Sequence, residues 1–407
     1  MSVTGIATLV VDLGNSETRA VVKFGVNSKG QKRVKRFSLP NVFYKYPDED
    51  TVNSEVAQDL DKQEYYNEDN SSIFVNNKIA YCSGELAIEE HKDKNFRPTA
   101  LDKKYNSLNT VLSFKIVFLK AYEIIADWMN CDVNSVDVTW NVSCLMPPQD
   151  MDEVGGSIDE DKKDEKGSKL MISKIREVKD LEFLMPEVKK EIVIDHVRVF
   201  PEGFCALIAV LFKDVGVVRK EYADLLDDDV YTMIVDIGAG TTDCVVSKGR
   251  KILPYTKFTV TSGGNNVHQS LRNLLKKNMG IVVDDAKARR ASEVGVVRKG
   301  AVEEDVTKVV NTAKEGVAAK LENNIVQFLE TTGINIQDIS YILVCGGGSE
   351  NSVNENIKPI SEYLIEFLKE KCPEISLVEL PKELDENGNL VRMSPRLLNI
   401  VGASIMA

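Results

Sequence analysis

Two stretches of the chain share one design, an apolar strand that ends at an aspartate and a glycine turn that leads into a second strand. The first is TLVVDLGNSETRAVV, residues 8–22, and the second is MIVDIGAGTTDCVV, residues 233–246. Their aspartates, Asp12 and Asp236, stand 224 positions apart (236 minus 12). The residues before each aspartate are uniformly apolar, which is typical of a central strand of a buried sheet. The repetition predicts two related halves, each opening with this strand–turn–strand.

The residue types in the two turns predict anion binding. Glycines let the backbone turn tightly and present N–H groups to an anion, and hydroxyls add further donors. A carboxylate at the strand end can hold the water ligands of Mg²⁺. A plain tight turn would explain either stretch alone, but the same register in both favours two phosphate-binding turns that face each other across a cleft. The candidate contacts are Gly14, Asn15, Ser16, Thr18, Gly238, Gly240, Thr241, Thr242 and Asp243.

Two further motifs follow strands elsewhere in the chain. YILVCGGGSEN places Gly346, Gly347, Gly348 and Ser349 after a strand, where the absence of Cβ atoms leaves room for an adenosine ring. VRVFPEGFCALIAVL places Glu202 at the mouth of a helix, where a carboxylate can orient an attacking water. Taken alone, the glycine motif could be a mobile loop, and Glu202 could be an ordinary acidic residue at a helix N-terminus. The chain has no GxGxxG and no GxxxxGK[ST] motif, so nucleotide binding is argued from the paired turns.

The length, net charge and composition of the chain limit the classes of protein to which it can belong. At 407 residues, two or more domains are expected. A net charge of −12 argues against direct nucleic-acid binding and is compatible with a basic partner. Seven cysteines without a CxxC pair, no secretory signal and no long apolar run predict a cytoplasmic protein without a membrane span. The three histidines are far apart and suggest no zinc site.

Strand and helix patterns alternate along the chain, which predicts the α/β class. Residues 25–95 are mixed and polar, with an expected surface excursion from Tyr46 and a hairpin about Asn76–Asn77. The other expected elements are a hairpin at 6–24, helices at 107–129, 201–213, 283–294, 303–331 and 360–371, strands at 136–146 and 192–200, three strands within 230–261, a strand at 339–345, a helix opening after Gly263 and Gly264, a last helix ending at 407, and an exposed acidic loop at 149–169.

In this order the motifs DLGNSETR, PEG, DIGAGTTD, CGGGSE and NIVGASIM resemble the actin-type ATPase superfamily. The resemblance implies an actin-like ATPase fold, with two domains that each hold a ribonuclease-H-like mixed sheet flanked by helices, and a nucleotide cleft between them. It implies a first domain at 1–228 with a small variable subdomain around 30–100, and a second at 229–389 with a small subdomain around 265–300. Two connecting helices, at 201–213 and 390–407, would form the hinge.

Within the superfamily the chain is most similar to plasmid-segregating bacterial actins of the ParM type, through SGELAIEEH, WNVSCLMPP, VFPEG and the order of SGGNNVHQSL and VDDAKARRASEVG. The cofactors implied are Mg²⁺ and ATP, with GTP as the open alternative. By position, Asp12 and Asp236 would hold the metal through water, Glu202 and Asp236 would be catalytic, and Arg19 replaces a phosphate-contacting lysine. The remaining nucleotide contacts implied are Gly263, Gly264, Asn265, Lys287 and Arg290.

Three functions follow from this resemblance. The first is a cytomotive filament whose subunits bind and hydrolyse ATP, and which segregates plasmid or phage DNA through a DNA-binding adaptor protein. The second is a small-molecule kinase of the same fold, for which no acceptor-side base is identified. The third is a chaperone-like ATPase, which normally carries a substrate-binding domain that is not expected here. Filament form, polymerisation kinetics, adaptor and cargo are left open by the sequence.

Overall fold

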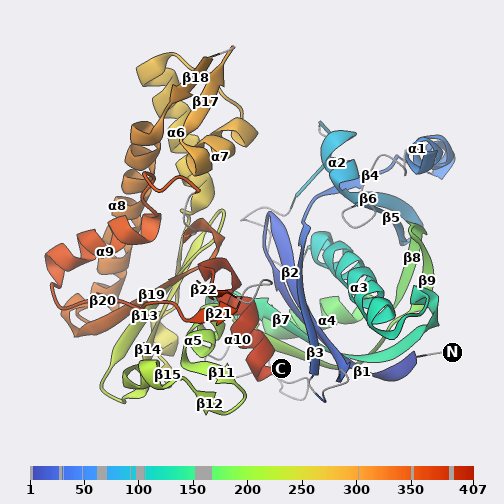
Figure 1. Ribbon diagram of the computed structural model, residues 1–407, viewed down its shortest axis with the longest axis horizontal. Coiled ribbons are helices and arrows are strands. Elements are labelled where there is room, and N and C mark those ends of the chain that lie inside the picture. The colour runs from blue at the N-terminus through green and yellow to red at the C-terminus, as the bar shows by residue number, and fades with distance from the viewer. Residues whose placement is uncertain are drawn as a thin grey trace.

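The computed structural model shows two halves side by side, each built on a mixed β-sheet with helices packed on it (Figure 1). It describes residues 3–26, 30, 32–47, 49–61, 71–91, 93–97, 105, 107–151, 167–300, 302–349, 353–384 and 389–407. Most of the acidic segment expected as a loop at 149–169 therefore lies outside the described residues. The predicted fold class, an actin-like α/β fold, is confirmed.

The main sheet of the first half has five strands in the order β10-β7-β1-β2-β3. β1 pairs with β2 antiparallel and with β7 parallel, so it is the central strand, and its residues from Leu9 to Val11 are fully buried. Helix α3 packs on one face, where the indole N–H of Trp140 donates to the Tyr122 hydroxyl at 2.9 Å. The bounds are β1 (Val3–Leu13), β2 (Glu17–Val26), β3 (Lys32–Pro40), β7 (Val136–Met146), β10 (Val193–Pro201) and α3 (Leu108–Met129).

A second sheet of the first half has the order β4-β6-β5-β8-β9. The predicted hairpin about Asn76–Asn77 is confirmed as β5–β6, with Asn77 and Lys78 at positive φ in its turn. Helix α1 lies within the stretch expected as a surface excursion, and the β8–β9 hairpin was not expected. The bounds are β4 (Phe43–Lys45), β5 (Ser71–Asn76), β6 (Ile79–Gly84), β8 (Asp180–Met185), β9 (Glu187–Glu191), α1 (Glu49–Asp61), α2 (Glu85–Glu89) and α4 (Gly167–Arg176).

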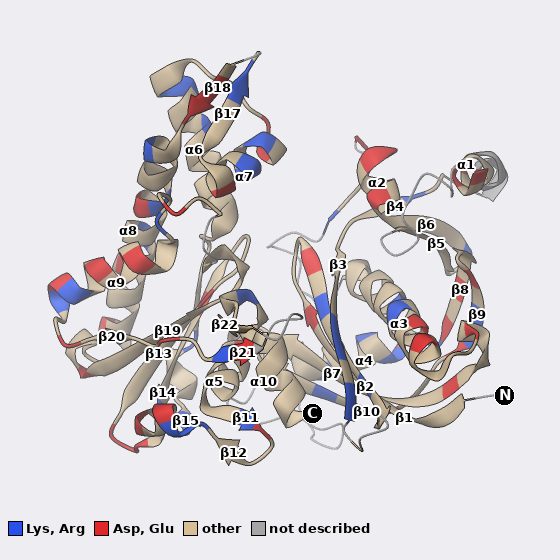
Figure 2. Cartoon of the chain, in the orientation of Figure 1, with Lys and Arg blue, Asp and Glu red and all other residues tan. Residues whose placement is uncertain are grey.

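The second half repeats the central arrangement of the first. β13 pairs with β14 antiparallel and with β19 parallel, as β1 does with β2 and β7. Acidic and basic residues alternate along the outer sides of α8 and α9 (Figure 2), as expected of amphipathic helices. The bounds are β13 (Tyr231–Ile237), β14 (Thr242–Lys248), β15 (Lys251–Ile252), β16 (Phe258–Val260), β17 (Val296–Lys299), β18 (Val302–Asp305), β19 (Ile339–Cys345), β20 (Ser376–Leu377), α6 (Gly264–Met279), α7 (Asp285–Val294), α8 (Thr307–Thr332) and α9 (Ile360–Lys371).

Helices α5 (Phe204–Leu211) and α10 (Leu398–Met406) lie between the two main sheets (Figure 1). Cys205 and Ile400 pack with Val10 of the first sheet, whereas Leu207 and Val401 pack in a cluster with strands of the second. A Cβ atom on Gly402 would lie 1.7 Å from the Cys205 carbonyl oxygen, so the two helices cross at backbone contact that only glycine permits. Two short hairpins flank the pair: β11 (Phe212–Asp214) with β12 (Val217–Val218), and β21 (Lys382–Leu384) with β22 (Leu390–Arg392).

Several predicted elements are shorter than expected. The second connecting helix implied at 390–407 spans only Leu398–Met406, and residues 390–392 form β22 instead. The helix predicted at 201–213 spans only Phe204–Leu211, because Pro201 ends β10 and Gly203 turns the chain at φ 73°. The helix predicted at 303–331 begins at Thr307, whose N–H donates to the Asp305 carboxylate at 2.8 Å, while the residues before it form β18. The last of the three strands predicted within 230–261 is divided into β15 and β16 at Pro254.

Candidate functional site

A cavity of about 650 Å³ lies where the two halves meet. Its walls come from both strand turns, the glycine turn after β19, the start of α5, and α6, α7 and α8. Fifteen of the residues predicted for the site line it: Asp12, Gly14, Asn15, Ser16, Arg19, Glu202, Asp236, Gly238, Thr241, Asp243, Gly264, Asn265, Gly346, Gly347 and Gly348. The structure therefore brings together residues from five separate segments of the chain.

The turn between β1 and β2 is closed by its own backbone. The N–H of Gly14 donates to the Glu17 carbonyl at 3.0 Å, and a Cβ atom on Gly14 would lie 2.5 Å from that same oxygen. Asn41, which follows β3, holds the turn from outside: its side-chain amide donates to the Gly14 carbonyl at 2.7 Å. The sequence analysis did not single out Asn41, which is 27 positions away from the glycine it supports.

The turn between β13 and β14 is closed in the same way. The N–H of Gly238 donates to the Thr241 carbonyl at 2.8 Å. The start of α6 rests on this turn, because the N–H of Gly264 donates to the Gly238 carbonyl at 3.0 Å. A Cβ atom on Gly263 would lie 2.6 Å from that carbonyl oxygen, so glycine is needed for the approach. The amino end of a 16-residue helix is thus placed beside the turn, where its dipole favours an anion.

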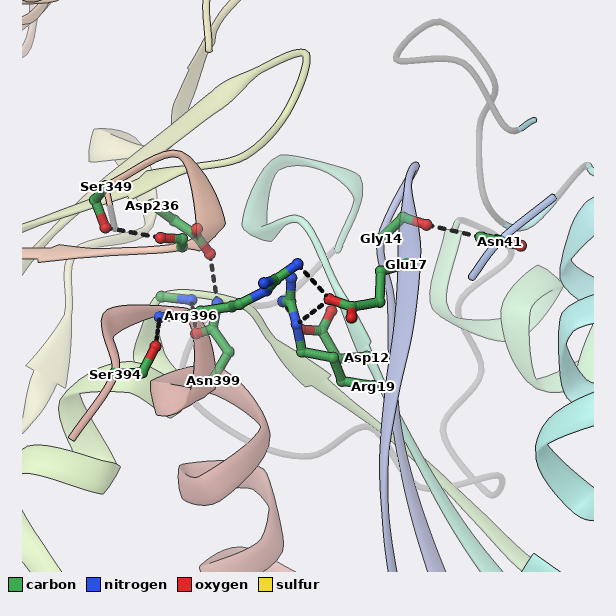
Figure 3. A network of polar contacts seen from close by, with 12 residues as sticks. Asp12, Gly14, Glu17, Arg19, Asn41, Asp236, Ser349, Ser394, Arg396 and Asn399 are labelled. Atoms are coloured by element: carbon green, nitrogen blue, oxygen red, sulfur yellow. Dashed lines mark hydrogen bonds and ion pairs between the residues drawn. The ribbon is translucent and has the colours of Figure 1, made fainter. Parts of the chain in front are cut away.

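Three carboxylates converge on the cavity: Asp12, Glu202 and Asp236 are 6%, 8% and 7% exposed. Burial, with the charges of these three groups, raises the pKa of the Cys205 thiol on α5. Asp12 accepts from the Arg19 guanidinium at 3.3 Å, and Asp236 accepts from the side-chain amide of Asn399 on α10 (Figure 3). The same Asn399 accepts the Gly203 N–H at 2.9 Å and so ties the residue after Glu202 to Asp236.

The donor set fits a hydrated Mg²⁺ ion. Among the described residues, no group of three or more His, Cys, Asp or Glu side chains is placed to hold a metal ion by itself. Mg²⁺ usually keeps several waters and takes only one or two carboxylates together with substrate phosphates. Asp12 and Asp236, one on each half, supply such carboxylates on the wall of a cavity that has room for a phosphate.

Arg19 and Arg396 form an ion-pair network in the cavity (Figure 3). The Glu17 Oε2 atom accepts from Arg19 Nε at 3.2 Å and from Arg396 Nη2 at 2.6 Å. Arg396 lies just before α10, and its place is fixed because the Gly346 N–H donates to the Pro395 carbonyl at 3.1 Å. The sequence analysis missed Arg396, because 379 positions separate it from Glu17 (396 minus 17) and no local pattern marks it.

The glycine turn after β19 packs directly on Asp236. Gly346 has φ +87°, and a Cβ atom there would lie 2.2 Å from Asp236 Oδ1. A Cβ atom on Gly348 would lie 2.7 Å from the Ile237 side chain. Ser349 is buried and donates its hydroxyl to the Gly346 carbonyl at 2.7 Å, which closes the turn. Glycine is therefore required here for close packing as well as for open space in the cavity.

The far end of the cavity is lined by α6, α7 and α8 through His268, Arg289, Ser292, Glu293 and Lys314. Burial, then the charges of Arg289 and Lys314, lower the pKa of His268 to about 4, so the imidazole is neutral at pH 7. Burial lowers the pKa of Lys314 to about 8, although the Glu293 carboxylate acts in the opposite direction. This end of the cavity is a compact polar surface that carries cations.

The placement of two predicted contacts on α7 is corrected. Lys287 and Arg290 do not line the cavity, and the Lys287 side chain is 70% exposed. Arg289 lines it instead, together with Ser292 and Glu293, which lie three and four residues later on the same side of α7.

Five other predicted contacts, Thr18, Gly240, Thr242, Gly263 and Ser349, are also absent from the lining. Thr18 and Thr242 are buried behind the two turns, and the Thr242 hydroxyl donates to the Ser262 carbonyl at 2.7 Å. Through this bond Thr242 supports the second turn from behind the cavity wall.

Two sequence comparisons match parts of the chain. Residues 234–358 match the family model described as the C-terminal part of the archaeal actin homologue MreB-like. The actin-like protein MamK of Paramagnetospirillum magneticum is 29% identical over 36% of this chain and 48% of that protein. The match therefore spans about half the length of this curated relative.

Several solved structures superpose on nearly the whole chain. Actin-like protein Alp7A gives a TM-score of 0.66 at 17% identity, covering 100% of this chain and 96% of that one. ParM of Bacillus thuringiensis with ATP gives 0.58 at 16% identity, covering 98% of each chain. A 15-stranded ParM filament from Clostridium botulinum gives 0.57 at 17% identity, covering 99% and 98%. At these identities the comparisons show an actin-like fold.

Proposed function

We propose that the chain binds a nucleoside triphosphate with Mg²⁺ in the cavity between its halves, hydrolyses it, and couples turnover to assembly into filaments. The observation that carries the proposal is the pair of matching turns whose aspartates, Asp12 and Asp236, face one cavity together with Glu202. The similarity to a ParM structure with ATP supports the same site.

The backbone of the two turns would hold the phosphates, because N–H groups at a glycine turn are donors that favour anions. The N–H groups of Gly264 and Asn265 at the start of α6 are bonded to the second turn, so this helix would contribute through its dipole. Arg19 would add a charged, forked donor. Asp12 and Asp236 would hold the water ligands of Mg²⁺, whose charge would offset that of the phosphates.

The far end of the cavity would hold the base and ribose. The Arg289 guanidinium can stack on a base, and Ser292, Glu293 and Lys314 supply hydrogen-bonding groups of both kinds. Lys314 can donate to acceptors of either purine, so adenine and guanine are both kept in the proposal. Parallel titrations with Mg-ATP and Mg-GTP decide between them.

Glu202 would act on the attacking water. It follows β10, its N–H donates to the Met146 carbonyl at 2.8 Å, and its side chain is 8% exposed on the cavity wall. In the proposed step the water oxygen bonds to the γ-phosphorus, the bond to the bridging oxygen breaks, and Glu202 accepts the water proton. The products are the nucleoside diphosphate and inorganic phosphate.

The test is hydrolysis by Glu202→Ala beside wild type and Glu187→Ala, a control on the exposed part of β9. General-base catalysis typically contributes about 10²–10⁴-fold, so phosphate release should fall by that order while Mg-nucleotide affinity stays near wild type. Unchanged hydrolysis would remove the catalytic role. ATP-dependent phosphorylation of a sugar or acid would instead support a kinase of the same fold.

Assembly would be head to tail, through an interface whose rotation does not close a ring. A filament among the similar structures supports this part of the proposal. Light scattering and pelleting should rise with Mg-nucleotide at high protein concentration, and Glu202→Ala filaments should persist longer than wild-type filaments. No rise in scattering would overturn it. Segregation of plasmid or phage DNA, through a basic DNA-bound adaptor suited to the net charge of −12, is the cellular role we propose.

A further inference from the structure

We propose, on the premise that the cavity binds a nucleoside triphosphate, that Glu17 is an internal anion that competes with the nucleotide phosphates for Arg19 and Arg396. The single Oε2 atom of Glu17 accepts from both guanidinium groups, at 3.2 Å and 2.6 Å. We call these contacts the Glu17 bridge. They link the first turn to the segment before α10, and thus one wall of the cavity to the other (Figure 3).

The two guanidinium groups meet at one point of the cavity. A Cβ atom on Gly347 would lie 3.4 Å from Arg19 Nη2 and 3.8 Å from Arg396 Cγ and Nε. Both side chains therefore lie against the same glycine of the turn after β19, although one comes from β2 and the other from the opposite wall. One arginine guanidinium can bind a phosphate through two parallel hydrogen bonds. A point where two guanidinium groups meet is therefore suited to a phosphate group.

The charge balance of the cavity explains why Glu17 must yield. Among the described residues, six carboxylates and four cations line it: Asp12, Asp150, Glu202, Asp236, Asp243 and Glu293 against Arg19, Arg289, Lys314 and Arg396. A triphosphate adds several negative charges to a wall that already carries more acids than cations. Two of the four cations are held by Glu17, and Arg19 is held by Asp12 as well. Phosphate can gain these arginines only in competition with Glu17.

The expected consequence is that Glu17 lowers nucleotide affinity and Arg396 raises it. Glu17→Gln keeps the shape of the side chain and removes its charge. Charge-assisted hydrogen bonds are about twice as strong as neutral ones, so Glu17→Gln should bind Mg-ATP roughly fivefold more tightly and Arg396→Gln roughly tenfold more weakly. The Arg36–Glu383 pair between β3 and β21 provides a matched control, since Nη1 and Oε2 are 2.9 Å apart and Glu383 is 24% exposed against 22% for Glu17. Neither residue of that pair lines the cavity, whereas Arg19 and Arg396, the partners of Glu17, both do.

The experiment is calorimetric titration of wild type, Glu17→Gln, Arg396→Gln, the double variant and Glu383→Gln with Mg-ATP, together with thermal unfolding with and without saturating Mg-ATP. Glu17→Gln should lower the melting temperature of the empty protein, and this deficit should disappear when the nucleotide is saturating. A bridge with a purely structural role would lower the melting temperature equally in both states and leave affinity unchanged.

The outcomes separate the two proposals. If wild type binds Mg-ATP and Glu17→Gln binds it equally or more weakly, the inference about Glu17 is overturned while the proposed function stands. If Glu383→Gln shifts affinity as much as Glu17→Gln, the effect is one of general charge and the bridge has no special role. If wild type does not bind Mg-ATP or Mg-GTP, the proposed function is overturned, and the inference with it.

Discussion

The two strand turns have the same backbone and different charges. In both, a four-residue turn is closed by a bond from its first N–H to its last carbonyl, at 3.0 Å for Gly14 and 2.8 Å for Gly238. The residue that faces the aspartate across the hairpin differs. Arg19 is opposite Asp12, whereas Asp243 is opposite Asp236.

This difference assigns the two turns different electrostatic roles. The carboxylate of Asp12 has a guanidinium partner on the neighbouring strand, whereas Asp236 accepts from the neutral amide of Asn399. The second half brings its cations from the helices instead, with Arg289 on α7 and Lys314 on α8. The backbone geometry of the turn is thus duplicated, while the cations differ: Arg19 lies beside the first turn, and Arg289 and Lys314 lie at the far end of the cavity.

The largest effect we expect comes from neutralising the two aspartates separately. Asp236→Asn removes one of the two carboxylates that would hold Mg²⁺, so Mg-nucleotide affinity should fall about 100-fold. Asp12→Asn also loses a carboxylate but releases Arg19 toward the phosphates, and the loss should be only about tenfold. Calorimetry with and without Mg²⁺ measures both. Equal losses, or a larger loss for Asp12→Asn, would show that the asymmetry between the turns has no bearing on binding.

Substitution of the two turn glycines should lower the free energy of unfolding by different amounts, because the space around them differs. A Cβ atom would lie 2.5 Å from the Glu17 carbonyl oxygen at Gly14 and 3.0 Å from the Thr241 carbonyl oxygen at Gly238. Overpacking of this kind costs about 1–3 kcal/mol, so Gly14→Ala should lose about 2 kcal/mol of unfolding free energy and Gly238→Ala about 1 kcal/mol. Denaturant unfolding measures the difference.

An exposed glycine of α8 supplies the control for this pair. Gly316 has nothing within 4 Å of its ideal Cβ position, so Gly316→Ala should stabilise the protein by about 0.5–1 kcal/mol. If Gly238→Ala cost as much as Gly14→Ala, the two turns would be equally tight.

A smaller effect is expected where the second half supplies its cations. Arg289→Ala removes a guanidinium from the base end, and loss of one stacking contact should weaken nucleotide binding about tenfold. Arg290→Ala is the matched control, because it lies one residue along the same helix and does not line the cavity. A loss of affinity in Arg290→Ala alone would contradict the orientation of α7.

The sequence predicted well those parts of the molecule whose signal is local. Strands β1 and β13 are recognisable because apolar runs end at a glycine turn, and the turn after β19 because three glycines follow a strand. Helix α1 was not expected, because its sequence EDTVNSEVAQDLD is mostly polar and a short helix of this kind is stabilised by packing rather than by its pattern.

The parts of the candidate site that the sequence did not predict depend on contacts between distant segments. Asn41 and Arg396 contact the first turn from elsewhere in the chain, and no sequence motif indicates these contacts. The error on α7 has another cause, since neighbouring residues on a helix point about 100° apart. The small buried residues Ala288 and Ala291 gave too weak an apolar stripe to orient that helix.

The last effect concerns a pH dependence of stability that comes from the buried imidazole of His268, and the smallest change we expect is the part of it that Arg289 contributes. Burial, with Arg289 and Lys314 nearby, lowers the pKa of His268 to about 4, whereas an unfolded histidine titrates near 6.5. Between these values the unfolded chain binds the proton and the folded chain does not, so this group makes unfolding free energy rise with pH from about 4 to 6.5. His268→Gln should flatten the profile in that window, measured by denaturant unfolding at several pH values. The other histidines titrate in both proteins, so their contribution cancels in the comparison.

Arg289→Ala should raise the pKa of His268 part of the way toward its ordinary value, since it removes one of the charges that oppose protonation. Arg19→Ala at the first turn should leave the profile unchanged. If Arg19→Ala shifted it as much as Arg289→Ala, the two ends of the cavity would not be electrostatically separate.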